Sequence, residues 1–340
     1  MGPRSLAWLT LALGCVARDA TFHCEESSQC VHDGVLGVCG PDGTCSFVDA
    51  VRTIDAVRTI DARVPDPLVD GAARPCTGGS ATYTSTSGRC FSRHDVAVDL
   101  FGAMATCADL GRSLAIFRTE AEELEVQAAL IVEPGTPGGY YLGVNDLFIE
   151  GAFGWLDGRP ISYTRWLPGQ PQTVEPGDAA PGDDVVVLDR IDGGPRGWVD
   201  VPSTTLAGAL CVEPVRAVAP SGEAYVAIYG YLEYARAAIG CAAAGGVLAT
   251  ITDAAENTFV ASLAPNLPIW IGANDRLVEG TFAWTSGQPF GAYTSWGAGE
   301  PSGDTVWGDQ DCSVVRTTGE WDDTACGFGY IGAAACDQGR

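Results

Sequence analysis

The sequence contains no lysine and only three histidines, so arginine supplies all 19 of its basic residues. None of the histidines lies in a Ser/His/Asp arrangement or in the HExxH pattern of zinc peptidases, and the glycine patterns that bind phosphates and dinucleotides are also absent. Adjacent carboxylates such as Asp322 and Asp323 could serve a glycosidase, but neighbouring carboxylates in a loop more often bind a metal ion. The sequence therefore predicts a binding protein, not an enzyme.

Positive charge is scarce overall, because 43 acidic residues outnumber the basic ones and give a formal net charge of −24 at pH 7. Such a chain repels the phosphates of nucleic acids and the headgroups of anionic lipids, and it attracts cations. A long apolar run is also missing, since the run at residues 6–14 is too short to span a bilayer. We therefore expect neither a nucleic-acid partner nor a transmembrane segment.

The N-terminus has the features of an export signal. Arg4 precedes a short apolar segment that ends in Ala12-Leu13-Gly14-Cys15. This ending resembles the lipobox of bacterial lipoproteins, in which Cys15 would carry the lipid, and its small residues also suit ordinary signal cleavage. We expect a signal peptide at residues 1–14 and an exported chain, either secreted or anchored to the membrane at the cell surface.

Cysteine is plentiful, with thirteen in the chain, and twelve remain for six disulfides if Cys15 is set aside. A small cysteine-rich module is predicted at residues 22–46, which is too short for a hydrophobic core and must depend on cross-links. Its cysteines can pair in three ways, and a zinc site is the alternative; they are Cys24, Cys30, Cys39 and Cys45. Residues 47–75 are predicted to be a linker, because they hold a duplicated hexapeptide and then a proline-rich stretch.

The rest of the chain repeats its own motifs. Leu114 and Glu122 follow Cys107 by seven and fifteen residues, and Leu248 and Glu256 follow Cys241 at the same offsets. Later pairs keep the same order: Asn145 with Asn274, Trp155 with Trp284, Trp166 with Trp296, Trp198 with Trp321, and Cys211 with Cys336. We predict two duplicated domains, at residues 76–214 and 222–337.

Each predicted domain has the same local pattern. Residues 107–126 and 241–260 have helical apolar spacing, and the aromatic runs that end at Asp146 and Asp275 have the composition of strands. The segments after Trp166 and Trp296 are rich in Gly, Pro and Asp, which predicts long loops. Long ordered loops on a compact domain often carry function.

This ordered series of motifs, present twice, resembles the C-type lectin-like domain family. The resemblance implies an α+β fold with two helices, small antiparallel sheets and a long loop region in each domain. It implies four disulfides: Cys107–Cys211, Cys241–Cys336, Cys312–Cys326 and Cys76–Cys90. Val185 and Ser203 stand where the first domain would carry its own loop disulfide.

In sugar-binding members of this family, a calcium ion in the long loop binds the hydroxyl groups of the sugar, which suits an ion with six to eight oxygen ligands. The resemblance places this site in the second domain, at Glu300, Ser302, Asp309, Gln310, Asp311, Asp322 and Asp323. Ser302 and Gln310 depart from the family pattern and are poorer ligands. We predict calcium-dependent carbohydrate binding here, and neutralising Asp323 is expected to weaken calcium binding and relieve carboxylate crowding. The alternative is a metal-independent protein-binding module on the same fold.

The first domain has a weaker set at the corresponding positions, namely Gln170, Gln172, Asp183, Asp184 and Asp200. Val199 has no ligand atom, so a loop without metal is expected there. Asp146 with Glu150 and Asp275 with Glu279 resemble an accessory calcium site of some relatives, although such residues also occur in plain turns. Trp307, in the second long loop, could stack on a sugar ring or simply pack within the loop. The predicted partner is a glycan or a surface protein.

Overall fold

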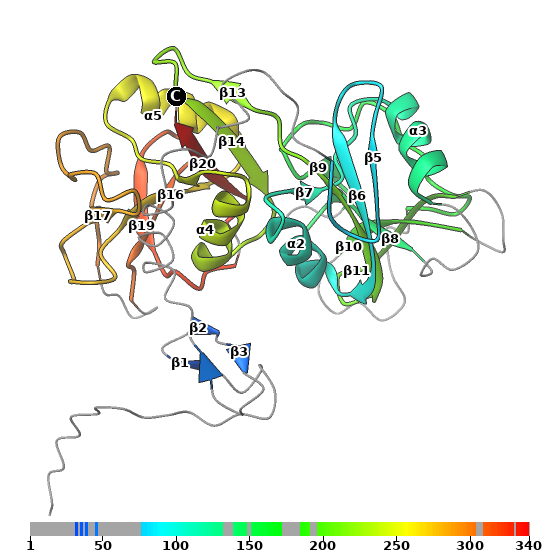
Figure 1. The fold of residues 1–340 in the computed structure, drawn as a ribbon, viewed down its shortest axis with the longest axis horizontal. Helices are drawn as coiled ribbons and strands as arrows, with labels where there is room; N and C mark the ends of the chain where they lie inside the picture. Colours follow the sequence, from blue (N-terminus) through cyan, green and yellow to red (C-terminus); the bar gives the residue numbers. More distant parts are fainter. Residues whose placement is uncertain are drawn as a thin grey trace, which may run out of the picture. The chain divides into compact units, whose positions relative to one another are not determined.

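The computed structural model describes residues 76–131, 139–147, 151–171, 184–190, 196–303, 309–329 and 331–339, and four short strands before residue 47. The chain divides into two units, Met1–Ala62 and Arg63–Arg340 (Figure 1). In the first unit, β1 (Val31–His32) pairs with β2 (Val35–Leu36), and β3 (Val38–Cys39) pairs with β4 (Cys45–Ser46). The predicted signal peptide, Cys15 and the predicted linker lie outside the described residues. Within the described part, no helix combines the length and apolarity that a membrane span needs.

The first half of the larger unit is built around an eight-stranded sheet. Its strands are β5 (Ala81–Thr84), β6 (Cys90–Val98), β7 (Ser113–Leu114), β8 (Tyr140–Asn145), β9 (Gly154–Trp155), β10 (Asp184–Asp189), β11 (Gly197–Pro202) and β12 (Ala207–Val212). They lie in the order β11-β10-β8-β12-β6-β5, with β7 beside β12 and β9 beside β8. One pair, β8 with β12, is parallel.

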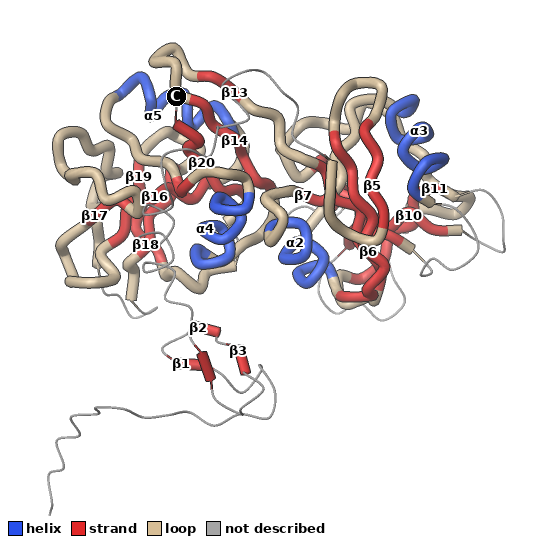
Figure 2. Tube along the Cα trace, in the orientation of Figure 1, coloured by secondary structure: helices blue, strands red, loops and turns tan. Residues whose placement is uncertain are grey.

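The second half repeats this topology. Its strands are β13 (Ala217–Val218), β14 (Ala224–Tyr229), β15 (Val247–Leu248), β16 (Ile269–Asn274), β17 (Ala283–Trp284), β18 (Cys312–Val315), β19 (Trp321–Thr324) and β20 (Ala333–Gly339). Their order is β13-β14-β20-β16-β18-β19, with β15 beside β20 and β17 beside β16 (Figure 2). Read from the other end, this is the order of the first sheet, and here too the one parallel pair joins the equivalent strands, β16 and β20.

Two helices accompany each sheet: α2 (Leu100–Ala108), α3 (Glu120–Leu130), α4 (Tyr234–Ala243) and α5 (Ala254–Leu263). The segments predicted as helical, 107–126 and 241–260, each contain the end of one helix, a two-residue strand and the start of the next helix. Gly111 follows the end of α2 with a φ of +67°, and a Cβ there would lie 2.5 Å from the backbone nitrogen of Ala244. Only glycine fits this backbone and this contact. Side-chain caps then start α3 at Thr119 and α5 at Asp253.

A buried tryptophan ties the second helix of each half to the loop region. The indole N–H of Trp198 donates to Glu123 Oε1 at 3.0 Å, and that of Trp321 donates to Asn257 Oδ1 at 2.6 Å. Both indoles are completely buried, so these hydrogen bonds satisfy donors that have no access to water. Trp321 begins β19, and its fixed position therefore places the two carboxylates that follow it.

The two halves share one hydrophobic cluster, which runs from α2 and β12 into β14 and α4. Polar contacts cross the same boundary. The N–H of Tyr229 donates to Ser113 Oγ at 2.8 Å, and Arg236 forms an ion pair with Asp109. The two halves therefore pack against each other through both apolar and polar contacts.

Four disulfides cross-link the larger unit: Cys76–Cys90, Cys107–Cys211, Cys241–Cys336 and Cys312–Cys326. They are the pairs that the family resemblance implies. Cys107–Cys211 and Cys241–Cys336 span 104 and 95 residues and join the first helix of each half to its central strand. A cross-link over a loop of about 100 residues stabilises a fold by up to roughly 4.7 kcal/mol in the chain-entropy account. Val185 and Ser203, which stand where the resemblance would place a loop disulfide in the first half, are both buried.

Candidate functional site

The acidic residues of the second half lie around the hairpin formed by β18 and β19. In this hairpin Ser313 lies opposite Asp323 and Val314 lies opposite Asp322, and Cys312–Cys326 closes its open end. The two aspartates are neighbours on β19. The side chain of Asp323 is 1% exposed, and that of Asp322 is 25% exposed.

Glu300, Asp322 and Asp323 bring carboxylate oxygens within 4.8 Å of one another. Asp323 accepts hydrogen bonds from the backbone N–H groups of Ser302 (2.8 Å) and Gly303 (2.7 Å). The Ser302 hydroxyl donates to Gln310 Oε1 at 2.6 Å. The loop and β19 thus bring together five of the seven residues predicted for the calcium site.

Arg316 already supplies a positive charge to this cluster, and the sequence analysis did not single it out. Its Nη2 lies 2.8 Å from Glu300 Oε1 and 2.7 Å from Asp322 Oδ1. Burial lowers the pKa of this guanidinium, but the hydrogen bonds and charges of Asp322 and Glu300 outweigh burial and raise it above its ordinary value. Arg316 follows the end of β18, so it reaches Asp322 only because the hairpin folds back on itself.

A second carboxylate cluster lies beside the first and joins Asp275, Glu279 and Asp311, again within 4.8 Å. Asp275 is 3% exposed, and its Oδ2 accepts the N–H of Gly280 at 2.8 Å. Burial raises the pKa of Asp275, and the charges of Asp323 and Asp309 raise it further. The structure therefore places Asp311 with the accessory pair and not with Glu300, while Asp309 is exposed and belongs to neither cluster.

The donor sets of both clusters fit a hard divalent cation. All their ligand atoms are oxygens, as calcium prefers. In each cluster one buried carboxylate oxygen, Glu300 Oε2 or Asp275 Oδ1, has no hydrogen-bond partner among the described residues. A buried carboxylate oxygen without a donor is unfavourable, and a bound cation would compensate it.

The first half differs at the corresponding places. Asp200 is buried, and its N–H donates to Gln170 Oε1 at 3.3 Å. Asp184 is described only as the first residue of β10, and Gln172, Asp183 and Glu150 lie outside the described residues. In the second half, Trp307 also lies outside the described residues. In the part of the first half that the structure describes, no group of three carboxylates comes together.

Residues 231–331 match the family model described as the lectin C-type domain. Lectin BRA-3 of Megabalanus rosa is 39% identical over 85 residues, which are 24% of this chain and 50% of that protein. C-type mannose receptor 2 of Homo sapiens is 25% identical over 231 residues, 55% of this chain and 14% of that protein. The chain thus spans half or less of the length of these curated relatives.

Among solved structures, the C-type carbohydrate-recognition domain of cow CD23 is similar to this chain. It is 30% identical, with a TM-score of 0.33, and the match covers 35% of this chain and 88% of that chain. Residues 231–331 contain a C-type lectin domain, with the C-type lectin-like fold. The Cys312–Cys326 disulfide lies within this range, and Cys241–Cys336 joins it to the last strand. Proteins of this family bind ligands and are not enzymes, in agreement with the prediction from the sequence.

Proposed function

We propose that the chain binds carbohydrate through calcium held by the loop and hairpin at residues 300–323. The observation that carries this proposal is the convergence of Glu300, Asp322 and Asp323, one of whose buried oxygens, Glu300 Oε2, has no hydrogen-bond partner among the described residues. The names of two similar proteins, a lectin and a mannose receptor, support carbohydrate as the ligand class.

Three carboxylates and two neutral oxygens would hold the ion: Glu300, Asp322, Asp323, Ser302 and Gln310. Bound calcium would accept the hydroxyl oxygens of a sugar as further ligands. Asp323 positions the backbone of Ser302 and Gly303, and Glu300 has one oxygen left for the ion. A second ion would be held by Asp275, Glu279 and Asp311, next to the same loop.

We also propose that residues 76–214 are a second C-type lectin-like domain. The identical strand order of the two sheets supports this, as does the match to the mannose receptor, which is longer than one domain. A shared turn adds support, because Asp146 accepts the N–H of Gly151 as Asp275 accepts that of Gly280. This domain would not bind calcium, because its loop offers neutral amides.

Binding to immobilised mannosylated albumin tests the carbohydrate proposal. We expect saturable binding in millimolar calcium and none after chelation. Glu300→Gln should abolish binding, whereas Gln170→Ala, at the equivalent position of the first half, should leave it within twofold. Equal binding with calcium and with chelator, or full binding by Glu300→Gln, would contradict the proposal.

The second candidate is a metal-independent protein-binding module. The contact of Arg316 with Glu300 and Asp322 favours it, because an arginine can neutralise these carboxylates without calcium. In that case calcium would not change the melting temperature. For either function we propose an exported chain, secreted or anchored at the cell surface through Cys15, and the four disulfides support an oxidising compartment.

A further inference from the structure

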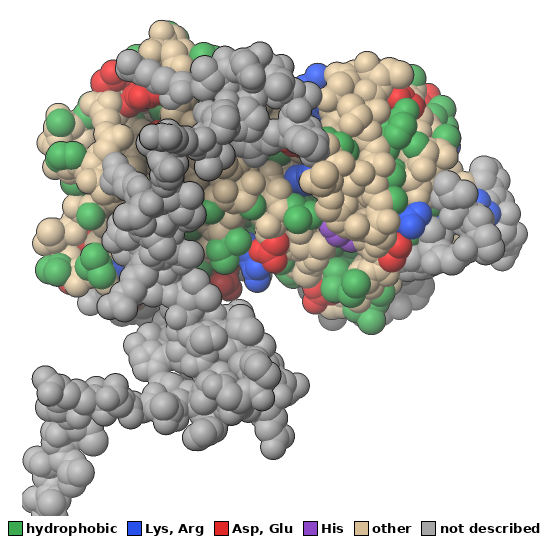
Figure 3. Space-filling model, in the orientation of Figure 1, with side chains coloured by type: hydrophobic (Ala, Val, Ile, Leu, Met, Phe, Trp, Pro, Cys, Tyr) green, Lys and Arg blue, Asp and Glu red, His purple; other side chains and the backbone are tan. Residues whose placement is uncertain are grey.

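A cavity of about 560 Å³ lies where the two halves of the larger unit meet. Four arginines line it, and Glu213 is the one carboxylate among its lining residues; the arginines are Arg89, Arg112, Arg118 and Arg216. This concentration runs against the composition of the chain, in which acidic residues outnumber basic ones by 43 to 19. Figure 3 shows the acidic side chains scattered in separate patches over one face.

Arg112 is a buried cation that forms no ion pair with any residue that the structure describes. Only 7% of the surface of this residue is exposed. Its guanidinium donates to the Ser92 hydroxyl (2.8 Å), the Thr77 carbonyl (2.8 Å) and the Cys90 sulfur (3.2 Å), which are all neutral. Burial lowers the pKa of Arg112, and the negative charge of Glu213 opposes this. Glu213 itself lies beyond ion-pair distance of Arg112. A buried guanidinium without a counter-charge is unfavourable, and a bound anion would compensate it.

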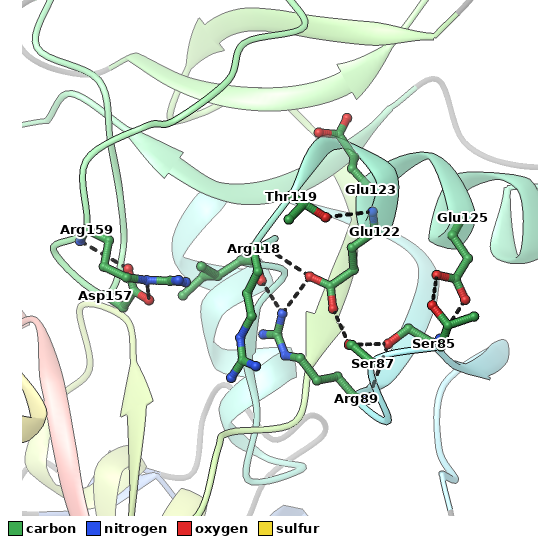
Figure 4. Close-up of polar contacts among 12 residues, drawn as sticks. Ser85, Ser87, Arg89, Arg118, Thr119, Glu122, Glu123, Glu125, Asp157 and Arg159 are labelled. Carbon is green, nitrogen blue, oxygen red and sulfur yellow. Dashed lines mark hydrogen bonds and ion pairs between the residues drawn. The ribbon is translucent and has the colours of Figure 1, made fainter.

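Arg89 and Arg118 add to the positive charge on another wall of the cavity. Arg89 Nη1 lies 2.9 Å from Glu122 Oε2, but its buried Nε has no hydrogen-bond partner among the described residues. Figure 4 shows the Arg118 side chain next to that of Arg89. Burial lowers the pKa of Arg89, Glu122 opposes this, and the positive charge of Arg118 lowers it again.

Arg118 and Arg216 are exposed at the cavity, and neither forms an ion pair with any residue that the structure describes. Guanidinium groups present several N–H donors in a plane, which matches the oxygens of sulfate and carboxylate groups. Cavities of about 300–1,000 Å³ suit small organic ligands, and this cavity falls in that range.

We propose that this cavity binds an anionic ligand of monosaccharide size that carries a sulfate or carboxylate group. Arg112 and Arg89 would form the buried floor, and Arg118 and Arg216 would contact the ligand from the rim. The site uses no calcium and none of the residues at 300–323, so it is independent of the proposed lectin site.

Isothermal titration of the full chain with sodium sulfate, sodium glucuronate and glucose tests this proposal. The buffer should be freed of calcium on a chelating resin, because soluble chelators are themselves anions. We expect one saturable site for sulfate or glucuronate, weakened by added salt, and no binding of glucose. Binding of sulfate alone would assign a sulfate ester, and binding of glucuronate alone would assign a carboxylate.

Three arginine variants separate a built site from a general charge effect. Arg118→Gln and Arg216→Gln should each weaken anion binding about five- to tenfold. Arg190→Gln removes the same charge from an exposed position outside the cavity and should change binding less than about twofold. Absence of saturable binding to the wild-type chain, or an equal loss in all three variants, would overturn the proposal.

Arg112→Gln provides a second readout. Removing an uncompensated buried charge should leave the anion-free chain as stable as wild type or more stable, while sulfate should no longer raise its melting temperature. If sulfate raised the melting temperature of Arg112→Gln as much as that of wild type, Arg112 would not contact the anion and the proposed floor would be wrong.

Discussion

The carboxylate of Asp323 accepts the backbone N–H of Ser302 at 2.8 Å, and its other oxygen accepts the N–H of the next residue. Twenty-one residues separate the two partners in the chain. The buried carboxylate of Asp323 therefore links strand β19 directly to the loop that follows Glu300. The same group thus has a structural role and a proposed role as a calcium ligand.

Asp323→Asn should lower stability even without calcium, because Asp323 accepts two backbone hydrogen bonds; this replaces the expectation from the sequence that the change would relieve carboxylate crowding. The amide NH2 group of asparagine would face a backbone N–H, so one buried donor loses its acceptor. We expect the free energy of unfolding in calcium-free buffer to fall by about 1–3 kcal/mol and calcium affinity to fall about ten- to a hundredfold. Denaturant melts and calorimetry measure the two effects. Asp200→Asn, at the matched position of the first half, is the control and should not change calcium affinity. If Asp323→Asn bound calcium as tightly as wild type, the proposed calcium site would be wrong.

Arg316→Gln should strengthen calcium binding. The guanidinium lies against Glu300 and Asp322, so it repels an incoming cation and occupies two carboxylate oxygens. Because Arg316 is 38% exposed, solvent weakens this effect, and we expect an affinity gain of about threefold to fivefold by calorimetry. A loss of affinity would instead show that Arg316 holds the two carboxylates in place.

Calcium should shift a single melting transition of the larger unit. At a hundred times its dissociation constant, a ligand adds about 2.7 kcal/mol to a folded state that alone binds it, which is about 5–11 °C for a unit of this size. Because one hydrophobic cluster contains residues of both halves, the first half should melt together with the second. Scanning calorimetry with and without calcium decides this, and two separate transitions would show that the halves unfold independently.

Stability should fall as the pH rises towards neutrality, through Glu223. A hydrogen bond with Glu256 raises the pKa of Glu223 to about 7, and burial and the charge of Glu256 contribute. The folded state therefore keeps a proton that the unfolded state releases at lower pH, so the contribution is complete below the unfolded pKa, 4.5, and is lost as the pH rises through about 7.

Glu223→Gln removes this loss. Since Glu223 is partly exposed, we expect a discounted gain of about 1 kcal/mol at pH 8, or about 2–4 °C in melting temperature, and no gain at pH 4. Glu320→Gln, an exposed glutamate on the β18–β19 turn, should show neither change. If the free energy of unfolding changed with pH in the same way in wild type and in Glu223→Gln, Glu223 would not be the source of this pH dependence.

Several features of this protein were determined by the sequence itself. The ordered series of cysteine and tryptophan motifs resembles the C-type lectin-like domain family, and that resemblance implied the four cross-links of the larger unit. The composition of the loop after Trp296 likewise predicted an acidic site there. Helix boundaries were less predictable, since Gly111 interrupts an apolar pattern that is otherwise helical.

The tertiary structure alone decided how the polar residues are grouped. Asp311 lies next to Gln310 in the chain, yet its carboxylate lies with Asp275 and Glu279, whereas Gln310 accepts a hydrogen bond from Ser302. Arg316 meets Asp322 across the hairpin, and Arg112 shares a cavity with Arg216 only because the two halves pack together. Such charges become neighbours through register and packing between distant segments, and local sequence patterns carry no information about either.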